Sequence, residues 1–291
     1  MAMKGFNIVV IHEKDPMIVA KAQDELTERM DPGFWNPEWF IHMRFGKYPL
    51  RSFKEFISDI TYGPIITGKR PLNLGDIKLG VAIIGQKQFT DVGLDLSEAI
   101  VVEEGSEWDL ERARVKQWDL LFPRSGVGSL GKGRMGIFPY PESEVKAVVS
   151  CFVDLIRING ILPQYVLVFL KSRFGQLQIR RFFSGVGTIN INFSQIGSIQ
   201  IHDIPLQLQQ QVAAEWDVVN HFHEIGIDLK AKMFLAQKHG NREAEREYQT
   251  KYKHNMEIAE AMLNDLIRQV EEIIEGKRTE IEPVDRILKE S

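Results

Sequence analysis

The residues of this chain with the most evident capacity for chemistry lie in a glycine-rich segment that begins at Gly126. Gly126-x-Gly128-x-x-Gly131 has the spacing of a dinucleotide fingerprint, and Gly126-x4-Gly131-Lys132 is nearly a P-loop. Both motifs hold phosphates against backbone N–H groups at the start of a helix. The P-loop also requires Ser or Thr after its lysine to hold magnesium, whereas Gly133 stands there.

The residues that follow argue against both phosphate motifs. Gly136, Pro139 and Pro141 occupy the positions where either motif requires a helix, and proline disrupts a helix interior. We therefore expect no nucleotide at this segment. A nucleotide-binding enzyme that uses residues 126–133 stays as an alternative, which predicts an ATP or dinucleotide affinity that Lys132→Ala abolishes.

Basic and amide side chains offer a second kind of chemistry, which is hydrogen bonding to phosphates and bases. The chain of 291 residues has a net charge of −4, yet residues 122–181 hold 9 basic against 3 acidic residues. Charge that contacts phosphate need only be local. Taken alone, this bias favours a solvated basic face over a phosphate-binding surface.

The elements that position these side chains are only partly readable. Residues 165–170 form a continuous apolar run, which is either a strand or a buried helix. Residues 188–193 alternate apolar and polar side chains, which predicts a half-buried strand. After Pro205, apolar residues recur every three or four positions, which predicts long helices. Gly240-Asn241 interrupts them, so we expect a helical hairpin or one interrupted helix.

The N-terminal half predicts a mixture of strands, helices and loops. We expect a strand at residues 6–11, a helix at 16–30, a short amphipathic helix at 49–57 and a glycine-containing loop at 62–71. Residues 80–84 and 99–102 have the β-branched content of further strands.

The order of these segments resembles the target recognition domain of the DNA specificity subunit of type I restriction-modification enzymes. Glu28–Trp39 resembles the opening signature of that family, although Gly33 and the tryptophans depart from it. Asp119–Gly128 resembles its D-L-L-F-x-R-S-G-x-G segment. Residues 163–211 resemble its run from a Pro-x-Tyr segment through a basic stretch and a glycine turn to Ile-Pro-Leu and a glutamine-rich helix.

The resemblance implies an α+β fold in two parts. Residues 1–205 would form a DNA-binding recognition domain with a twisted, mostly antiparallel β-sheet and short helices. Residues 206–291 would form coiled-coil-like helices for dimerisation and partner binding. Family members usually carry two recognition domains, so this chain resembles a half-subunit, and we expect a homodimer.

The implied function is sequence-specific recognition of double-stranded DNA by a non-catalytic subunit. Its partners would be a DNA methyltransferase subunit and, in a complete system, a restriction translocase. We expect no cofactor in this chain and S-adenosylmethionine in the methyltransferase. An alternative within the same fold is a protein that binds a methyltransferase to inhibit or retarget it.

Two sets of residues follow from this hypothesis. The candidate DNA contacts are Thr67, Lys69, Arg70, Arg124, Ser125, Lys132, Arg134, Arg157, Lys171, Arg173, Gln176, Gln178, Arg180, Arg181, Ser184, Thr188 and Asn190, which we expect mainly on loops. The candidate helix-packing and dimerisation residues are Leu206, Val212, Trp216, Val219, Tyr252, Met256, Leu263, Leu266 and Val270.

Several other classes of protein are not expected. His221 and His223 are two positions apart, which on a helix separates their side chains, so we predict no metal site. The single cysteine, Cys151, excludes an intramolecular disulfide framework. No stretch has the roughly 18 apolar residues of a membrane span, and no secretory leader is seen, so we expect a cytoplasmic protein.

Overall fold

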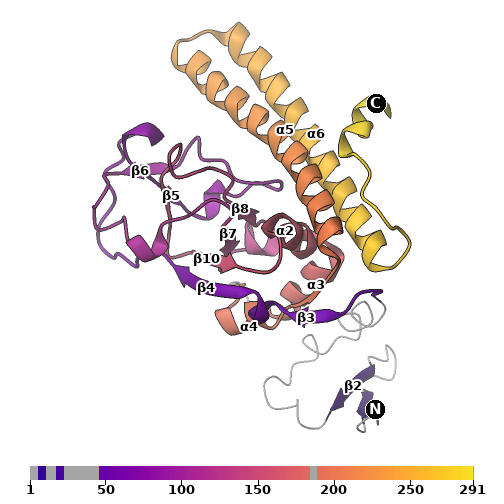
Figure 1. Ribbon diagram of the computed structural model, residues 1–291. Coiled ribbons are helices and arrows are strands. Elements are labelled where there is room, and N and C mark those ends of the chain that lie inside the picture. Colours follow the sequence, from indigo (N-terminus) through magenta and orange to yellow (C-terminus); the bar gives the residue numbers. More distant parts are fainter. Residues whose placement is uncertain (1–5, 11–17, 23–45, 184–188, 291) are drawn as a thin grey trace.

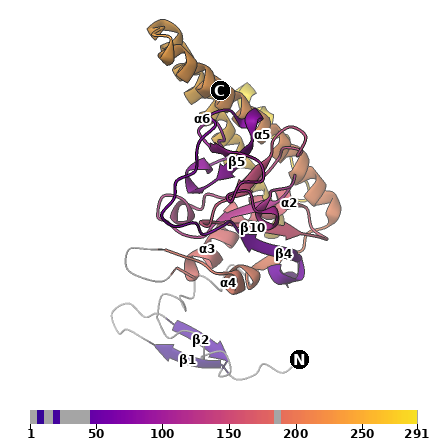
Figure 2. The ribbon, with the colours of Figure 1, turned by 90° about the vertical axis from the view of Figure 1, so that its left-hand side faces the viewer.

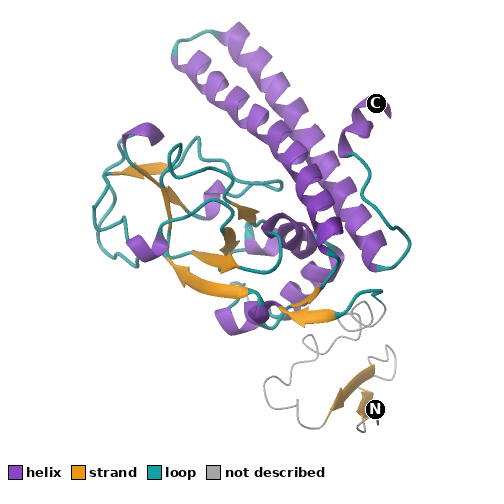
Figure 3. Cartoon of the chain, viewed as in Figure 1, coloured by secondary structure: helices purple, strands orange, loops and turns teal. Residues whose placement is uncertain are grey.

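The computed structural model describes residues 6–10, 18–22, 46–183 and 189–290. It combines small, mostly antiparallel sheets and short helices with a long helical hairpin, which confirms the predicted α+β class (Figure 1, Figure 3). The segment Glu28–Trp39, which carries part of the family resemblance, lies outside the described residues.

The main sheet has four antiparallel strands in the order β4-β10-β7-β8. These strands are β4 (Ile57–Tyr62), β10 (Val153–Ile158), β7 (Leu120–Pro123) and β8 (Gly136–Ile137). Alternate side chains of β10 enter different cores: Ile156 joins the larger core and Leu155 a second one. This packing on both faces explains why the strand is apolar along most of its length.

Three smaller sheets complete the β structure. β5 (Val81–Ile84) lies between the antiparallel β6 (Ile100–Val102) and the parallel β9 (Ala147–Val149), while β3 (Leu50–Ser52) pairs with β11 (Gln200–His202) and β1 (Phe6–Val10) with β2 (Ile18–Ala22). Short 3-10 turns are η3 (Phe53–Glu55), η4 (Ile77–Leu79), η5 (Gln86–Gln88), η6 (Glu111–Ala113), η7 (Leu130–Lys132) and η8 (Val284–Arg286).

Two predicted helices in the N-terminal part are wrong where the structure describes them. Residues 18–22 form strand β2, because pairing with β1 overrides the helical pattern. Residues 49–57 form β3 and the single turn η3, in which Ser52 N–H donates to the Glu55 carboxylate and the Ser52 hydroxyl donates to the Gly197 carbonyl. The predicted strands at 80–84 and 99–102 are confirmed as β5 and β6.

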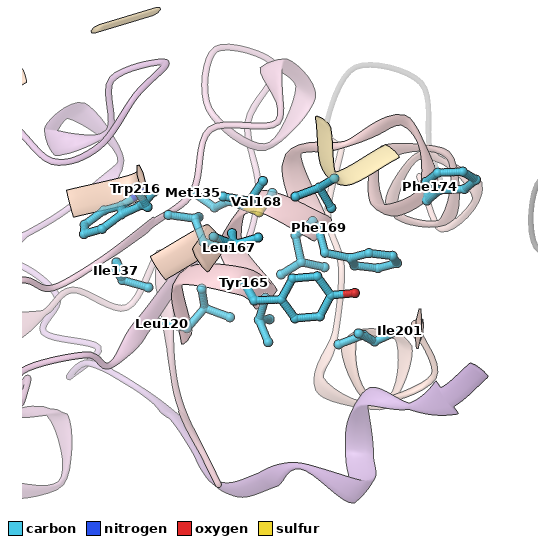
Figure 4. Close-up of a cluster of buried hydrophobic side chains, with 14 of the residues drawn as sticks. Leu120, Met135, Ile137, Tyr165, Leu167, Val168, Phe169, Phe174, Ile201 and Trp216 are labelled. Carbon is cyan, nitrogen blue, oxygen red and sulfur yellow. The ribbon is translucent and has the colours of Figure 1, made fainter. Parts of the chain in front are cut away.

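The apolar run that was open between strand and helix is helix α2 (Pro163–Lys171). Residues 164–170 are all buried, so its hydrophobicity is continuous instead of periodic. Pro163 stands at the first helical position, which suits its fixed φ angle. Ser172 ends α2 and caps α3 (Arg173–Arg181), since its hydroxyl lies within hydrogen-bond reach of Gly175 N–H. Figure 4 shows Tyr165 and Phe169 of α2 among the buried side chains.

The strand predicted over 188–193 is largely wrong. Gly126 N–H donates to the Ile189 carbonyl and Ile191 N–H to the Arg124 carbonyl, so only residues 189–191 lie extended along the chain that follows β7. Asn192 then caps helix α4 (Phe193–Gly197) by accepting from Gln195 N–H. The cap ends the extended segment, although the alternation persists locally: Ile191 is buried and Asn190 is exposed.

The C-terminal part is a helical hairpin of α5 (Leu206–Lys238) and α6 (Arg242–Ile274), followed by η8 and α7 (Ile287–Glu290). Gly240 has φ +70°, a conformation that favours glycine, and Asn241 caps α6 through Ala244 N–H. The turn between the two helices projects beyond the sheets (Figure 1, Figure 2).

The predicted packing residues of the hairpin have different environments. Six are buried in the same core as helix α2, which therefore joins the hairpin to the sheet: Val212, Trp216, Val219, Leu263, Leu266 and Val270. Tyr252 and Met256 are half-buried, and Leu206 is 59% exposed, so Leu206 does not pack.

Candidate nucleic-acid interface

One group of candidate residues lies at the end of the main sheet, where β4 and β7 end and β10 begins. Asp154 at the start of β10 pairs with Tyr62 on one side and Phe122 on the other. Arg124 follows Phe122 by two residues, so its side chain lies on the same face of the sheet as Asp154. Three chain segments thus fix one arginine.

The Arg124 guanidinium is held by two aromatic rings and one carboxylate. It lies 4.3 Å from the centre of the Tyr62 ring and 5.7 Å from that of Phe193, and its Nε is 3.1 Å from Asp154 Oδ1. A cation over an aromatic face is attracted by the ring quadrupole. The Arg124 side chain is nevertheless 30% exposed, so it can contact a ligand at the surface.

The residues around Arg124 form a mixed polar and apolar surface. Gln86 Nε2 donates to both the carbonyl and the hydroxyl oxygen of Ser125, which is bridged to Asn190. Phe152, whose carbonyl accepts from Arg124 N–H, is 58% exposed, and Val127 is 61% exposed. We define the reading face as Gln86, Arg124, Ser125, Val127, Phe152 and Asn190.

Three members of the reading face were not predicted from the sequence. Gln86 lies far from Arg124 in the chain and reaches Ser125 only through the fold. Phe152 and Val127 are apolar, and apolar residues are usually assigned to a core. Phe152 lies in the turn between β9 and β10, and no sequence motif singled it out.

The glycine segment does not form a phosphate cradle. Six backbone N–H groups of this loop donate to backbone carbonyls, namely those of Gly126, Ser129 and residues 131–134. The Gly126 bond goes to Ile189, and the other five stay within the loop. The helical turn that follows, η7, has three residues and leads into β8. Phosphate motifs need free amides at the start of a true helix, so this geometry disfavours a nucleotide at residues 126–133.

A basic pocket of about 270 Å³ lies beside this segment, between helices α2 and α3 on one side and helix α6 on the other. Its cationic lining is Lys132, Lys171 and Arg180, and Asp91 and Glu260 add two carboxylates. Burial lowers the pKa of Lys171 to about 8, and its Nζ donates to the Asp91 carbonyl at 2.8 Å. Lys171 is thus mainly structural, which leaves Lys132 and Arg180 to attract an anion.

Two further candidates near the basic pocket are occupied by contacts within the chain. The Arg134 guanidinium bonds both carboxylate oxygens of Asp91, at 2.7 and 2.9 Å, and holds the pKa of that carboxyl below its usual range. Gln176 Nε2 donates to the Leu170 carbonyl. Both side chains therefore shape the pocket.

Helix α3 corrects the expectation that its candidates lie on loops. Gln176, Gln178, Arg180 and Arg181 all belong to this helix. Gln178 is buried, and its amide exchanges hydrogen bonds with the backbone of Gln200 in β11. Gln178 therefore supports the fold and does not reach a surface ligand. The cause is that α3 is amphipathic and turns one face to the core.

Arg173 also has a structural contact. Its side chain forms ion pairs with Glu271 of α6 and with Glu275, the C-cap residue of that helix, and its backbone N–H donates to the Glu271 carboxylate. These contacts tie the start of α3 to the end of the hairpin.

The remaining candidates lie away from the reading face. The Arg157 side chain, on the opposite face of β10, is 2.8 Å from Asp59 and 3.4 Å from Asp119, and lines a separate cleft of about 500 Å³ with Arg112, Arg114 and Lys116. Lys69 pairs with Glu107 at 3.0 Å in an exposed loop that also carries Thr67 and Arg70. Ser184 and Thr188 lie outside the described residues.

The described part of the chain contains no group of three or more His, Cys, Asp or Glu that is able to hold a metal ion. His223 is buried, with Nε2 3.0 Å from the Thr90 hydroxyl, whereas His221 is exposed. Among the helices within the described ranges, none is long and apolar enough to cross a membrane.

Comparisons with known proteins found similarity at the level of solved structures. No protein-family model and no curated protein matches the sequence. The crystal structure of a type I restriction-modification system S subunit from M. genitalium matches 67% of this chain and 44% of its own, with a TM-score of 0.43 and 11% identity.

A second solved structure, described as the structural basis of complex assembly and conformational transition of the type I R-M system, matches 81% of this chain and 48% of its own. Its TM-score is 0.41 and its identity 13%. The chain therefore spans less than half the length of either solved chain.

Proposed function

We propose that this chain is a non-catalytic protein that recognises a specific sequence of double-stranded DNA. The observation that carries the proposal is the reading face, in which a stacked arginine stands beside the exposed amide of Asn190 and exposed apolar side chains. An arginine fork matches the acceptors O6 and N7 of guanine, and Asn or Gln matches adenine. Apolar groups such as Phe152 and Val127 fit the thymine methyl.

The basic pocket supplies the complementary function. Lys132, on the loop that continues from the reading face, and Arg180, on helix α3, both line it, and we assign them to backbone phosphates and Arg124 to bases. Phosphate contacts position a duplex without reading its sequence, and base contacts provide specificity. This division requires both groups on one side of the molecule.

The finer proposal is that the chain acts as a half-length specificity subunit that directs a DNA methyltransferase. It is based on the resemblance of the segments at residues 119–128 and 163–211. The proposed homodimer would place two reading faces at a fixed spacing on a symmetric target. Because the proximal hairpin residues are buried within the chain, its contacts would involve the distal half of the hairpin, where Phe234 and Leu235 are exposed.

The test is retention of duplexes from a pool with a randomised centre, followed by sequencing and by binding measurements at increasing salt. Enrichment of one motif and an affinity that falls steeply with salt are expected. Arg180→Ala should weaken all duplexes about equally, whereas Arg242→Ala, at an exposed position at the start of α6, is the charge-matched control. Retention without an enriched motif would exclude specific recognition.

A further inference from the structure

A buried carboxylate at the reading face has no evident role in the fold. Asp154 is 0% exposed, and neither of its carboxylate oxygens has a hydrogen-bond partner among the described residues. Arg124 Nε is 3.1 Å from Oδ1, close enough for an ion pair, but its N–H is not directed at the oxygen. Burial raises the pKa of Asp154 to about 7, and the Arg124 charge opposes this rise.

Such a group destabilises the protein that contains it. A buried carboxylate without hydrogen bonds loses its hydration and is poorly compensated by one ion pair. An apolar residue or an amide at the same position in β10 would carry a smaller free-energy penalty of burial. Destabilising ionisable groups with one charged partner concentrate at functional sites, and this one contacts the arginine of the reading face.

The geometry leaves one side of Arg124 available to a ligand. Asp154 lies against Nε, and the Tyr62 ring covers a face of the guanidinium at 4.3 Å. Arg124 donates no side-chain hydrogen bond to any residue that the structure describes, so its two Nη groups keep their donors. The guanidinium of Arg112, a residue of η6, also lies over the Tyr62 ring, 5.5 Å from its centre.

We propose that Asp154 is a positioning residue that makes Arg124 selective for a guanine edge over a phosphate. This inference rests on the proposed DNA-binding function. A carboxylate beside the guanidinium fixes its orientation and cancels much of its net charge at short range. An approaching phosphate is then repelled by Asp154, whereas the neutral acceptors of guanine still receive hydrogen bonds from the Nη groups. Arg124 alone would bind either.

The experiment compares Asp154→Asn, Arg124→Ala and the double variant with the wild type. Each is measured by competition between the duplex enriched by the wild type and the unselected pool. Asp154→Asn should raise the affinity for the unselected pool, so that the preference for the enriched duplex falls about tenfold or more. In the Arg124→Ala background the same substitution should change neither value, because Asp154 acts through Arg124.

A pH series on the wild type tests the same mechanism without a substitution. Protonation of Asp154 removes its charge, so preference for the enriched duplex should fall between about pH 8 and about pH 6, while Asp154→Asn stays low throughout. Tyr62→Leu, which removes the stacking ring, should also lower the preference for the enriched duplex. It replaces Asp154→Asn as the test variant if Asp154→Asn does not fold.

The inference is overturned if Asp154→Asn keeps the wild-type preference for the enriched duplex. It is also overturned if the substitution lowers that preference equally in the Arg124→Ala background. If Asp154→Asn does not fold, an unchanged preference in both the pH series and Tyr62→Leu overturns it. Failure of the proposed function is a different result. In that case the wild type retains no duplex, or enriches no motif, before any variant is compared.

Discussion

At the scale of single residues, Asp154 should reduce stability at neutral pH and above. Its folded pKa of about 7 lies above the ordinary value of 3.8, so the folded state binds the proton more tightly. The destabilisation is therefore complete above about pH 7 and disappears as the pH falls toward the unfolded pKa. Asp154→Asn should raise the free energy of unfolding by on the order of 2 to 4 kcal/mol at alkaline pH.

Chemical denaturation of the wild type and Asp154→Asn at several pH values measures this difference. The gain should shrink steadily between about pH 7 and about pH 4. A gain that is constant with pH would show that the substitution acts through packing and not through the charge.

Gln178 and Arg180 provide a matched pair on one helix. Gln178→Ala leaves the N–H and carbonyl of Gln200 without partners in a buried site, which should cost about 1 to 3 kcal/mol of stability. Its DNA affinity should not change once the protein is folded. Arg180→Ala should show the reverse: about tenfold weaker binding and a stability within about 0.5 kcal/mol of the wild type.

Denaturation and duplex binding of both variants in the same buffer check the pair. A loss of DNA affinity in folded Gln178→Ala would show that Gln178 contributes to DNA binding and not only to the fold.

The residues that the sequence could and could not place differ in how far their contacts extend along the chain. Arg124, Ser125 and Asn190 were predicted as DNA contacts, and the structure brings them together at one end of the main sheet. Gln178 was misplaced because its amide satisfies a strand that comes later in the chain. Gln86 was missed for the same reason, since its contact with Ser125 depends on the fold and not on local pattern.

At the scale of elements, local patterns predicted long helices after Pro205, as a hairpin or one interrupted helix, and the strands β5 and β6, but did not identify helices α2 and α4. Gly240 and Asn241 supply a left-handed residue and a helix cap at adjacent positions, which is enough to end one helix and begin the next. Helix α2 could not be separated from a strand because it is buried on all sides, which removes periodicity.

The turn of the hairpin gives a prediction at this scale. Gly240→Ala should destabilise the distal hairpin by about 1 kcal/mol, because alanine is strained at φ +70°. Hydrogen exchange should report faster exchange in residues near the turn and unchanged exchange in α2. Glu243→Ala, at an exposed position in the first turn of α6, is the control, with an expected loss of only a few tenths of a kcal/mol. Equal exchange in the two variants would contradict the strain argument.

At the scale of the whole molecule, one hydrophobic core joins the sheet to the hairpin. Ile156 of β10, Tyr165 of α2, Trp216 of α5 and Leu266 of α6 belong to the same buried cluster. The direction of the hairpin relative to the reading face is therefore fixed by packing. If the proposed function holds, a partner of the distal hairpin would lie at a defined distance from the bound DNA.

The homodimer is tested at this scale by light scattering of the full chain. The proposal predicts twice the mass of 33.4 kDa at micromolar concentration for the chain alone, two copies of the chain in its complex with a methyltransferase, and a decrease toward one copy when Phe234 and Leu235 are both changed to Ser. A monomer under both conditions would exclude pairing through the hairpin.

The central claim is that Arg124 reads a base in double-stranded DNA. The most direct measurement is the base preference of wild type and Arg124→Ala, each obtained by sequencing duplexes retained from the same randomised pool. We expect the wild-type motif to contain a guanine at one position. In Arg124→Ala the base preference at that position should be lost, while the preferences at the other positions are preserved. An identical motif in both proteins would contradict it.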